Sequence, residues 1–277
     1  MANGNFGGGS GINGDPYLIE DAADLSAVRN YTSSYFKQTA DINLSGYSPW
    51  EPIPYFTGEY DGNGYRIAGL IASRSGLFEA IGNNGIVKSL GIIEANVQSA
   101  DNHVGVLAGT NVGIIEKCYA TGIVAGKDWV GGLVGLNNLV VSDCFASVSV
   151  TGTNYVGGLI GSLSGGMRFC YSAGAVSGSA QVGGLVGHKS TETDPQVYSC
   201  YYDRETSGQS DAGKGEPKTT AEMQTKSTFV DWDFDTIWDI ATGYPYLRGW
   251  AVMSKGYCRC VTNMKAYLKL TGTSLGG

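Results

Sequence analysis

The chain lacks long apolar runs and clusters of positive charge. No stretch approaches the ~18 consecutive apolar residues that a membrane-spanning helix needs, so no membrane insertion is expected. Lys and Arg total 18 against 25 Asp and Glu, which gives a net charge of −7. Nucleic-acid binding needs clustered basic side chains, so this balance disfavours a nucleic-acid partner. The N-terminal residues also lack the basic and apolar regions of a secretion signal, so no signal-directed secretion is expected.

Histidine is scarce, and this limits the metal chemistry that the sequence predicts. His103 and His188 are the only two histidines, and no His-Glu-x-x-His motif is present. The motif Cys258-Arg259-Cys260 is too closely spaced for a zinc site. We therefore expect no catalytic residues, no metal site and no cofactor.

Glycine is abundant, with 43 residues, but without the Gly-X-Y period of collagen. The glycines belong instead to a Val-Gly-Gly-Leu motif that returns every 26 residues, and the cysteines Cys118, Cys144 and Cys170 keep the same step. A fixed period of this size is typical of a repeat architecture. We predict an all-β fold, a single-stranded parallel β-helix of about 26 residues per coil with short helical caps. The motif occupies residues 130–133, 156–159 and 182–185, and residues 104–107 carry it with Val106 in place of the second glycine.

Side-chain direction follows from the alternation of faces along a strand. The small apolar positions that begin with each cysteine are predicted to point into the coil, and the cysteines to form a column of buried thiols. Tyr119, Phe145 and Tyr171 then point outward as a column of rings. About three short strands fit into each coil.

A second outward column is predicted from the residue that precedes each repeated valine. It contains His103, Trp129, Tyr155 and Gln181. Exposed rings suit the apolar faces of sugars or a partner protein. The alternative is that the C-terminal segment or a neighbouring subunit covers both columns. The candidate binding residues are Trp129, Tyr155, His103, Tyr119, Phe145 and Tyr171.

The repeat boundaries divide the chain into four parts. Residues 1–75 are expected to form an N-terminal cap with the first coils, and residues 76–202 the main coils. Residues 203–250 are expected to be a C-terminal cap that begins with a polar loop over 203–220. Short helices are predicted near Asp21 and after Thr219. Residues 251–277 fit neither pattern, and we expect an attachment or subunit contact there.

Over residues 7–250 these motifs together resemble the GLUG-repeat family. The resemblance rests on Asp15-Pro16-Tyr17-Leu18-Ile19, on Tyr60-Asp61-Gly62-Asn63-Gly64, on the Val-Gly-Gly-Leu and Cys-Tyr-Ala-Thr-Gly repeats, and on Gly243-Tyr244-Pro245-Tyr246-Leu247. It implies a parallel β-helix found in bacterial surface proteins and phage particles, usually without an enzymatic role. Some relatives carry the repeats beside a zinc peptidase domain, but that activity does not carry over without the His-Glu-x-x-His motif.

Three further motifs have simpler structural explanations. The segment 208–215 has the spacing of a phosphate-binding loop, but Gly215 stands where Ser or Thr is needed. Asp61-Gly62-Asn63-Gly64 lacks the later acidic ligands of a calcium loop and is typical of a tight turn. Sugar hydrolysis requires two carboxylates across a cleft, and the sequence does not place any pair in this way. The candidate acids lie in a Trp-rich segment that is typical of a cap. These candidates are Asp231, Asp233, Asp235 and Asp239.

Taken together, the repeat and the resemblance favour a non-enzymatic structural and binding module. We expect a phage virion fibre, spike or decoration protein, located in the virion, whose partners are other virion proteins or a cell-surface glycan or protein. Such a role allows assembly as a homotrimer. One alternative is a fragment of a bacterial cell-surface adhesin. Another is a polysaccharide lyase or glycoside hydrolase built on a β-helix.

Overall fold

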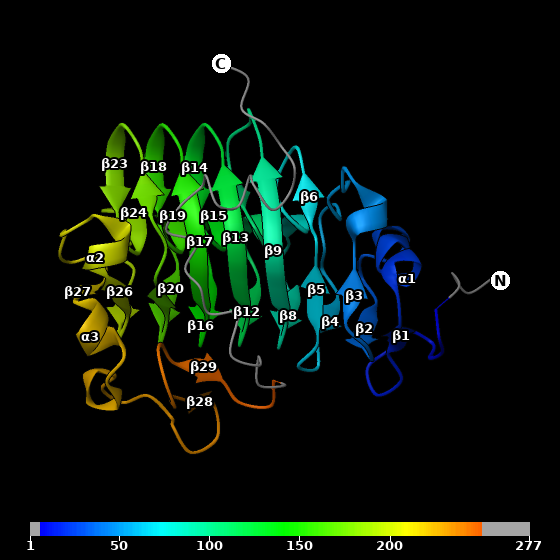
Figure 1. Ribbon diagram of the computed structural model, residues 1–277. Helices are drawn as coiled ribbons and strands as arrows, with labels where there is room; N and C mark the ends of the chain where they lie inside the picture. The colour runs from blue at the N-terminus through cyan, green and yellow to red at the C-terminus, as the bar shows by residue number, and fades with distance from the viewer. Residues whose placement is uncertain (1–5, 251–277) are drawn as a thin grey trace.

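Each 26-residue repeat forms one coil of a parallel β-helix in the computed structural model, which describes residues 6–250. Val104 pairs in parallel with Val130, and Val130 with Val156, so each coil lies directly on the previous one. The predicted fold class is confirmed. A full coil contains four short strands instead of the expected three, because the glycine-rich corner separates two strands. Figure 1 shows the strands side by side along one axis, with helices at both ends.

Sheets I and II contain the first and second strands of each coil. Sheet I runs the length of the solenoid and contains β1 (Tyr17–Ile19), β2 (Tyr35–Gln38), β4 (Glu59–Asp61), β8 (Ile86–Lys88), β12 (Ile114–Glu116), β16 (Val140–Ser142), β20 (Gly166–Arg168) and β25 (Val197–Tyr198). Sheet II contains β3 (Ile42–Asn43), β5 (Arg66–Ala68), β6 (Ile71–Ala72), β9 (Gly91–Gln98), β13 (Tyr119–Ala125), β17 (Phe145–Thr151), β21 (Tyr171–Ser172), β22 (Val176–Ser177), β26 (Tyr201–Asp203) and β27 (Glu216–Lys218).

Sheets III and IV flank the glycine corner of the Val-Gly-Gly-Leu motif and complete each coil. Sheet III contains β10 (Val104–Gly105), β14 (Asp128–Gly131), β18 (Asn154–Gly157) and β23 (Ala180–Gly183). Sheet IV contains β7 (Phe78–Ile81), β11 (Ala108–Asn111), β15 (Val134–Asn137), β19 (Ile160–Leu163) and β24 (Val186–Lys189).

The core contains the predicted column of thiols. Cys118, Cys144 and Cys170 are completely buried, and Leu90 takes the same place one coil earlier. Each thiol donates to the carbonyl oxygen two residues before it, as from Cys144 Sγ to Ser142 O at 3.1 Å. These cysteines and Cys200 are all free. The prediction of buried, unbridged thiols is therefore confirmed. The Cys258-Arg259-Cys260 motif lies outside the described residues.

The N-terminal end is closed by a short helix and a cluster of rings. Helix α1 (Ala22–Ala27) begins after Asp21, whose carboxylate accepts from the amides of Ala23 and Asp24. Phe6 stacks on Tyr17 with ring centroids 4.5 Å apart. This end of the solenoid therefore presents a helix and packed rings in place of an open strand edge. Single 3₁₀ turns occur at Val28–Asn30, Ser45–Tyr47 and Lys226–Thr228.

The C-terminal end is closed by two helices and a hairpin-like pair of strands. Helix α2 (Arg204–Ser207) and strand β27 lie within residues 203–220, so the prediction of a simple loop there was wrong. The many turn-forming residues of that segment led to the loop prediction, although Asp203 caps a short helix there. Helix α3 (Thr220–Met223) begins at Thr219 as predicted. The antiparallel strands are β28 (Trp238–Asp239) and β29 (Tyr246–Leu247). The predicted role of residues 251–277 falls outside the described residues.

Candidate functional site

The first predicted ring column is buried, so the expectation that it is exposed was wrong. Tyr119, Phe145 and Tyr171 point away from the coil interior, as the alternation predicts, but are only 4%, 8% and 1% exposed. Their rings stack almost parallel at 4.7 and 5.0 Å. Large apolar side chains from the C-terminal segment pack over them. The alternative that this segment covers the column is what the structure shows. The covering residues include Phe229, Trp232, Phe234, Trp238, Tyr244 and Leu247.

Polar bonds fix this C-terminal cap on the column. Tyr171 donates from its hydroxyl to Pro245 O at 2.7 Å. Trp238 donates from Nε1 to the carboxylate of Asp143 at 3.1 Å in a buried setting. Burial raises the pKa of Asp143 to about 6, and the hydrogen bond from Trp238 lowers it only partly. The covered column of Tyr119, Phe145 and Tyr171 therefore holds the cap in place. Its rings are not accessible to a ligand.

The second column remains partly exposed at the surface. His103, Trp129 and Tyr155 are half-buried, whereas Gln181 is exposed. The ring centroids of His103 and Trp129 are 4.8 Å apart, and those of Trp129 and Tyr155 are 5.3 Å apart. His188 from β24 adds an edge-on contact with Tyr155 at 5.1 Å. We call His103, Trp129, Tyr155 and His188 the ring ladder.

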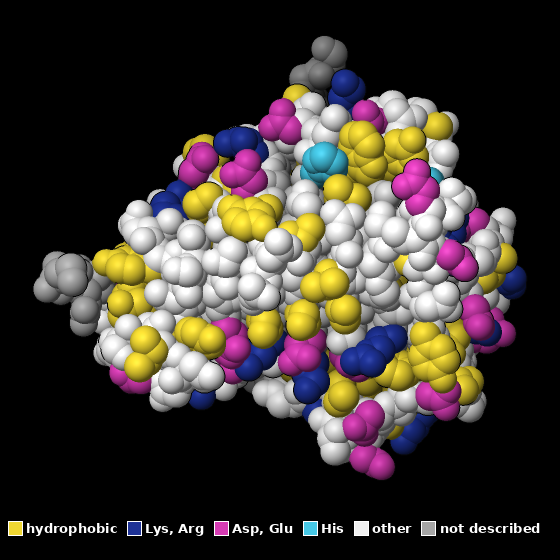
Figure 2. All heavy atoms as spheres, turned by 180° about the vertical axis from the view of Figure 1, so that it is seen from behind, with side chains coloured by type: hydrophobic (Ala, Val, Ile, Leu, Met, Phe, Trp, Pro, Cys, Tyr) yellow, Lys and Arg dark blue, Asp and Glu magenta, His cyan; other side chains and the backbone are white. Residues whose placement is uncertain are grey.

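Sequence reasoning placed Gln181 at the end of this column and missed His188. The alignment considers positions one coil apart within one sheet, whereas His188 belongs to sheet IV of the next coil. Its imidazole Nδ1 lies 3.2 Å from Ser162 Oγ, which fixes the ring against Tyr155. Ser162 and His188 are paired in register and are separated by the same 26-residue step. This spacing was the sequence signal that could have placed His188 next to the column. Figure 2 shows a histidine beside a group of hydrophobic side chains on this side of the molecule.

The backbone beneath the ladder adopts an uncommon conformation. His103, Trp129 and Tyr155 have φ of 57°, 55° and 56°, in the left-handed region. Bulky residues rarely adopt this conformation, which costs roughly 1–2 kcal/mol per residue. Close packing enforces it, because a Cβ at Gly161 would lie 2.6 Å from the carbonyl carbon of Trp129. Asn and Gly fit this backbone better than an aromatic residue does.

The ring geometry decides which chemistry the ladder offers. Trp129 and Tyr155 are inclined by only 16°, so each covers a face of the other. Their edges, which carry the partial positive charge of the ring, remain available to carbonyl oxygens and other side chains. A sugar stacks on an open ring face, which this arrangement leaves mainly at its ends. The ladder therefore suits a polypeptide surface better than a glycan.

The ladder itself carries no formal charge in its neutral form. Burial lowers the pKa of His103, which favours its neutral imidazole. Beside Trp129, the carboxylate of Asp128 accepts from the side-chain amide of Asn154 at 2.7 Å. The rings therefore offer apolar contact and hydrogen bonds.

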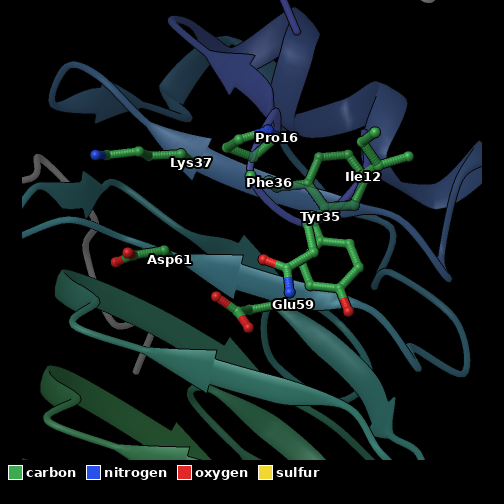
Figure 3. A pocket seen from close by; sticks show the side chains of 9 residues that line it. Ile12, Pro16, Tyr35, Phe36, Lys37, Glu59 and Asp61 are labelled. Atoms are coloured by element: carbon green, nitrogen blue, oxygen red, sulfur yellow. The ribbon is translucent and has the colours of Figure 1, made fainter. Parts of the chain in front are cut away.

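A shallow hollow at the N-terminal part of sheet I is a less suitable site. Figure 3 shows Glu59 and Asp61 next to one another on β4, with Lys37 extending away from them. Lys88 Nζ lies 2.7 Å from Glu59 Oε1 and 4.0 Å from Asp61 Oδ2. These carboxylates are thus already paired with a cation from the next coil.

The three motifs with simpler explanations also have structural roles. The amide of Asn63 donates to Asp61 at 2.8 Å in a tight turn, as predicted. In the segment 208–215, Asp211 accepts from Gly184 N at 2.9 Å and Lys214 donates to Gly187 O at 2.7 Å, so this segment closes the last coil. The aspartates of the cap make local bonds, such as that of Asp233 with Thr236.

Within residues 6–250, no group of three or more His, Cys, Asp or Glu is arranged to hold a metal ion. In the same range, no helix has the length and apolar character needed to cross a membrane.

Comparison with known proteins shows relatives by sequence over short stretches only. No family model matches the chain, so membership of the GLUG-repeat family remains a prediction. A provisionally named Gly-rich membrane protein of Evansella cellulosilytica is 41% identical over 129 residues, which cover 40% of this chain and 15% of that protein. Halomucin of Haloquadratum walsbyi is 40% identical over 83 residues, which cover 28% of this chain and 1% of that protein.

Two solved structures share the fold. A provisionally named immunoglobulin A1 protease from Bacteroides ovatus superposes with a TM-score of 0.73 over 88% of this chain and 95% of that chain, at 22% identity. An IgA1 protease superposes with a TM-score of 0.52 over 67% of this chain and 16% of that chain, at 18% identity.

These two structures contradict the expectation that the protein is not an enzyme. That expectation rested on the usual role of such repeats, whereas both solved structures with this fold are named as proteases. A β-solenoid of this kind thus occurs in proteins named for catalysis. The finding identifies the fold of this chain and leaves its activity to experiment.

Proposed function

We propose that the chain is a binding module of a surface-displayed or secreted protein, and that the ring ladder contacts a protein partner. The observation that carries the proposal is the left-handed backbone under His103, Trp129 and Tyr155. Three consecutive coils place rings at positions where a ring is conformationally unfavourable, and they align these rings on a partly exposed face. The names of the relatives, a Gly-rich membrane protein and Halomucin, support a location at the cell surface.

Immunoglobulin A1 is the first partner to test, because both fold neighbours are named for it. We expect immobilised immunoglobulin A1 to bind the full chain, and Trp129→Asn to weaken this binding by about tenfold or more, as for an aromatic hot spot. Asparagine tolerates the left-handed backbone, so the variant removes the ring without adding strain. Enzymatic removal of glycans from the immunoglobulin is expected to leave binding unchanged.

Leu139→Asn is the matched control, since Leu139 is an apolar side chain that is 42% exposed outside the ladder. Binding that Trp129→Asn and Leu139→Asn reduce equally would refute the role of the ladder. Binding that disappears with the glycans would replace the protein partner with a carbohydrate. A complete lack of binding to immunoglobulin A1 would refute this choice of partner.

A second candidate function follows from the names of the fold neighbours. The chain superposes on only 16% of the second neighbour, which suggests that it is one module of a longer proteolytic protein. The same incubation with immunoglobulin A1, analysed by gel electrophoresis, tests this candidate. Discrete fragments in the presence of the chain would assign cleavage to it, and an intact immunoglobulin would leave recognition as its contribution.

The virion role predicted from the sequence has no support among the relatives. Neither curated relative nor solved structure is named for a phage particle. The adhesin alternative agrees better with the surface-related names. We therefore propose the cell surface or the extracellular space as the location.

A further inference from the structure

At the C-terminal end of the solenoid, the last strands of the four sheets differ in how the cap covers them. Sheet II continues beyond the last full coil into β26 and β27. Sheet I ends at β25, where Tyr198 bonds to Asp231 of the C-terminal cap. At sheet IV, Lys214 donates to Gly187 O at 2.7 Å, and Asp211 accepts from Gly184 N at the adjoining corner. The cap thus extends sheet II and bonds to sheets I and IV.

At sheet III the cap bonds near the end of the last strand, where Lys214 Nζ donates to Val182 O at 3.5 Å. This last strand, β23, has no further strand beside it within residues 6–250. Residues 177–181 are all exposed, and the described part of the cap makes no hydrogen bond to them. Two such bonds flank the segment: Gln209 Nε2 donates to Val176 O at 3.2 Å just before it, and Lys214 Nζ donates to Val182 O at 3.5 Å just after it.

The backbone of this segment has donors that face the open end. In earlier coils, Gly126 donates to Thr151 O at 3.1 Å, and Gly152 donates to Ser177 O at 3.0 Å. Gly178 is the equivalent donor in the last coil, where no next coil of sheet III follows in the described chain. His103, three coils earlier in the same column, donates its backbone N–H to Asp128 O of the next coil. Gln181 has a similar φ, so its backbone N–H points in the same direction, toward the open end.

Natural edge strands usually carry charge, proline or a covering segment that prevents pairing with another chain. Residues 177–181 carry none of these, because residues 169–188 contain no Asp, Glu, Lys or Arg and no Pro. The charged cap side chains Lys214 and Asp211 bond to the edge beyond them, at Val182 O and Gly184 N. The donors and acceptors of residues 177–181 keep the spacing of a parallel ladder, and an extended polypeptide backbone is the ligand that matches this spacing.

We propose that residues 177–181, which include the start of β23, bind an extended, uncharged peptide segment of a protein partner by parallel strand addition. The added segment takes the position that the next coil would occupy beside these five residues and ends before Val182, where Lys214 bonds. This site uses backbone groups at the solenoid end, so it is independent of the proposed function of the ring ladder.

Amide hydrogen exchange measured by NMR on the full chain tests the proposal. The probe is a synthetic peptide with the sequence of residues 152–159, which forms the coil that pairs with β23 on its other side. At about 1 mM peptide, we expect exchange at Gly178 and Gln181 to slow by about tenfold. Exchange at Gly152, which already donates within the solenoid, is expected to stay unchanged.

Two controls separate edge pairing from other effects. Ser179→Lys places a charge at the edge and is expected to abolish the protection, whereas Thr153→Lys, one coil earlier and equally exposed, is expected to retain it. A peptide with proline at the position of Tyr155 is expected to give no protection. Unchanged exchange with the native peptide would refute the site. Protection that grows with protein concentration without peptide would assign the edge to a second copy of the chain and overturn the proposal.

Discussion

Neutralising Asp143 is expected to change how the attachment of the C-terminal cap depends on pH. The carboxylate is buried under Trp238 and accepts its Nε1–H, and burial raises the pKa from 3.8 to about 6. Because the folded pKa lies above the unfolded one, the protonated form favours folding. This contribution is complete below about pH 4 and is lost as the pH rises through about 6.

The magnitude follows from the two pKa values. One pKa unit corresponds to about 1.4 kcal/mol, so the shift is worth at most about 3 kcal/mol. The pKa of about 6 already includes the lowering by the nearby cations Lys117 and Arg168. The remaining access of solvent reduces the contribution to about 2 kcal/mol. Asparagine at 143 still accepts from Trp238, remains neutral at every pH and tolerates the left-handed φ of 53°. Asp143→Asn is therefore expected to stabilise the cap by about 2 kcal/mol at pH 7 and by nearly nothing at pH 4.

Urea titrations between pH 4 and pH 7, followed by tryptophan fluorescence, measure this difference. Trp238 and Trp232 lie in the cap, so the signal reports its detachment. Asp128→Asn is the matched control on another side of the coil, and it is expected to keep the pH dependence of the native chain. An Asp143→Asn curve parallel to the native one over this range would refute the buried carboxylate as the cause.

Three further perturbations test the packing. Asp203→Ala removes the acceptor of Thr220 Oγ1 and the N-cap of α2, and should destabilise the cap by about 3 kcal/mol in the same urea assay. Gly161→Ala should cost more than about 2 kcal/mol in thermal unfolding because its Cβ meets backbone at 2.6 Å, whereas Gly166→Ala, with open space, should not. Burial raises the pKa of the Cys144 and Cys200 thiols, so maleimide labelling followed by mass spectrometry should modify both only after denaturation.

The repeating part of the fold is predictable because each coil obeys the same constraints. The 26-residue step fixes the register, and strand alternation then places Cys144 inside and Phe145 outside, as observed. The four strands of each coil were harder to predict. The Gly-Gly pair separates Asn154–Gly157 from Ile160–Leu163, and the sequence does not reveal that a strand resumes on both sides.

The fate of the site residues was less predictable because it depends on segments that do not repeat. Phe145 and Trp129 both point outward in the sequence pattern. Phe145 is covered because Trp238 is brought over it from far along the chain, with ring centroids 6.2 Å apart. No periodic pattern in the sequence links residues 145 and 238. The sequence therefore did not show whether Phe145 is exposed or covered.

The two ring columns differ in the backbone that supports them, and this difference separates structure from function. Phe145 and Tyr171 lie in regular strands, where aromatic residues are favoured, so packing under the cap explains them fully. Trp129 and Tyr155 lie in strands too, but with left-handed φ. Stacking of about 0.5–1.5 kcal/mol per pair offsets the backbone cost of roughly 1–2 kcal/mol only in part. The remaining backbone cost is what the proposed partner of the ring ladder would offset.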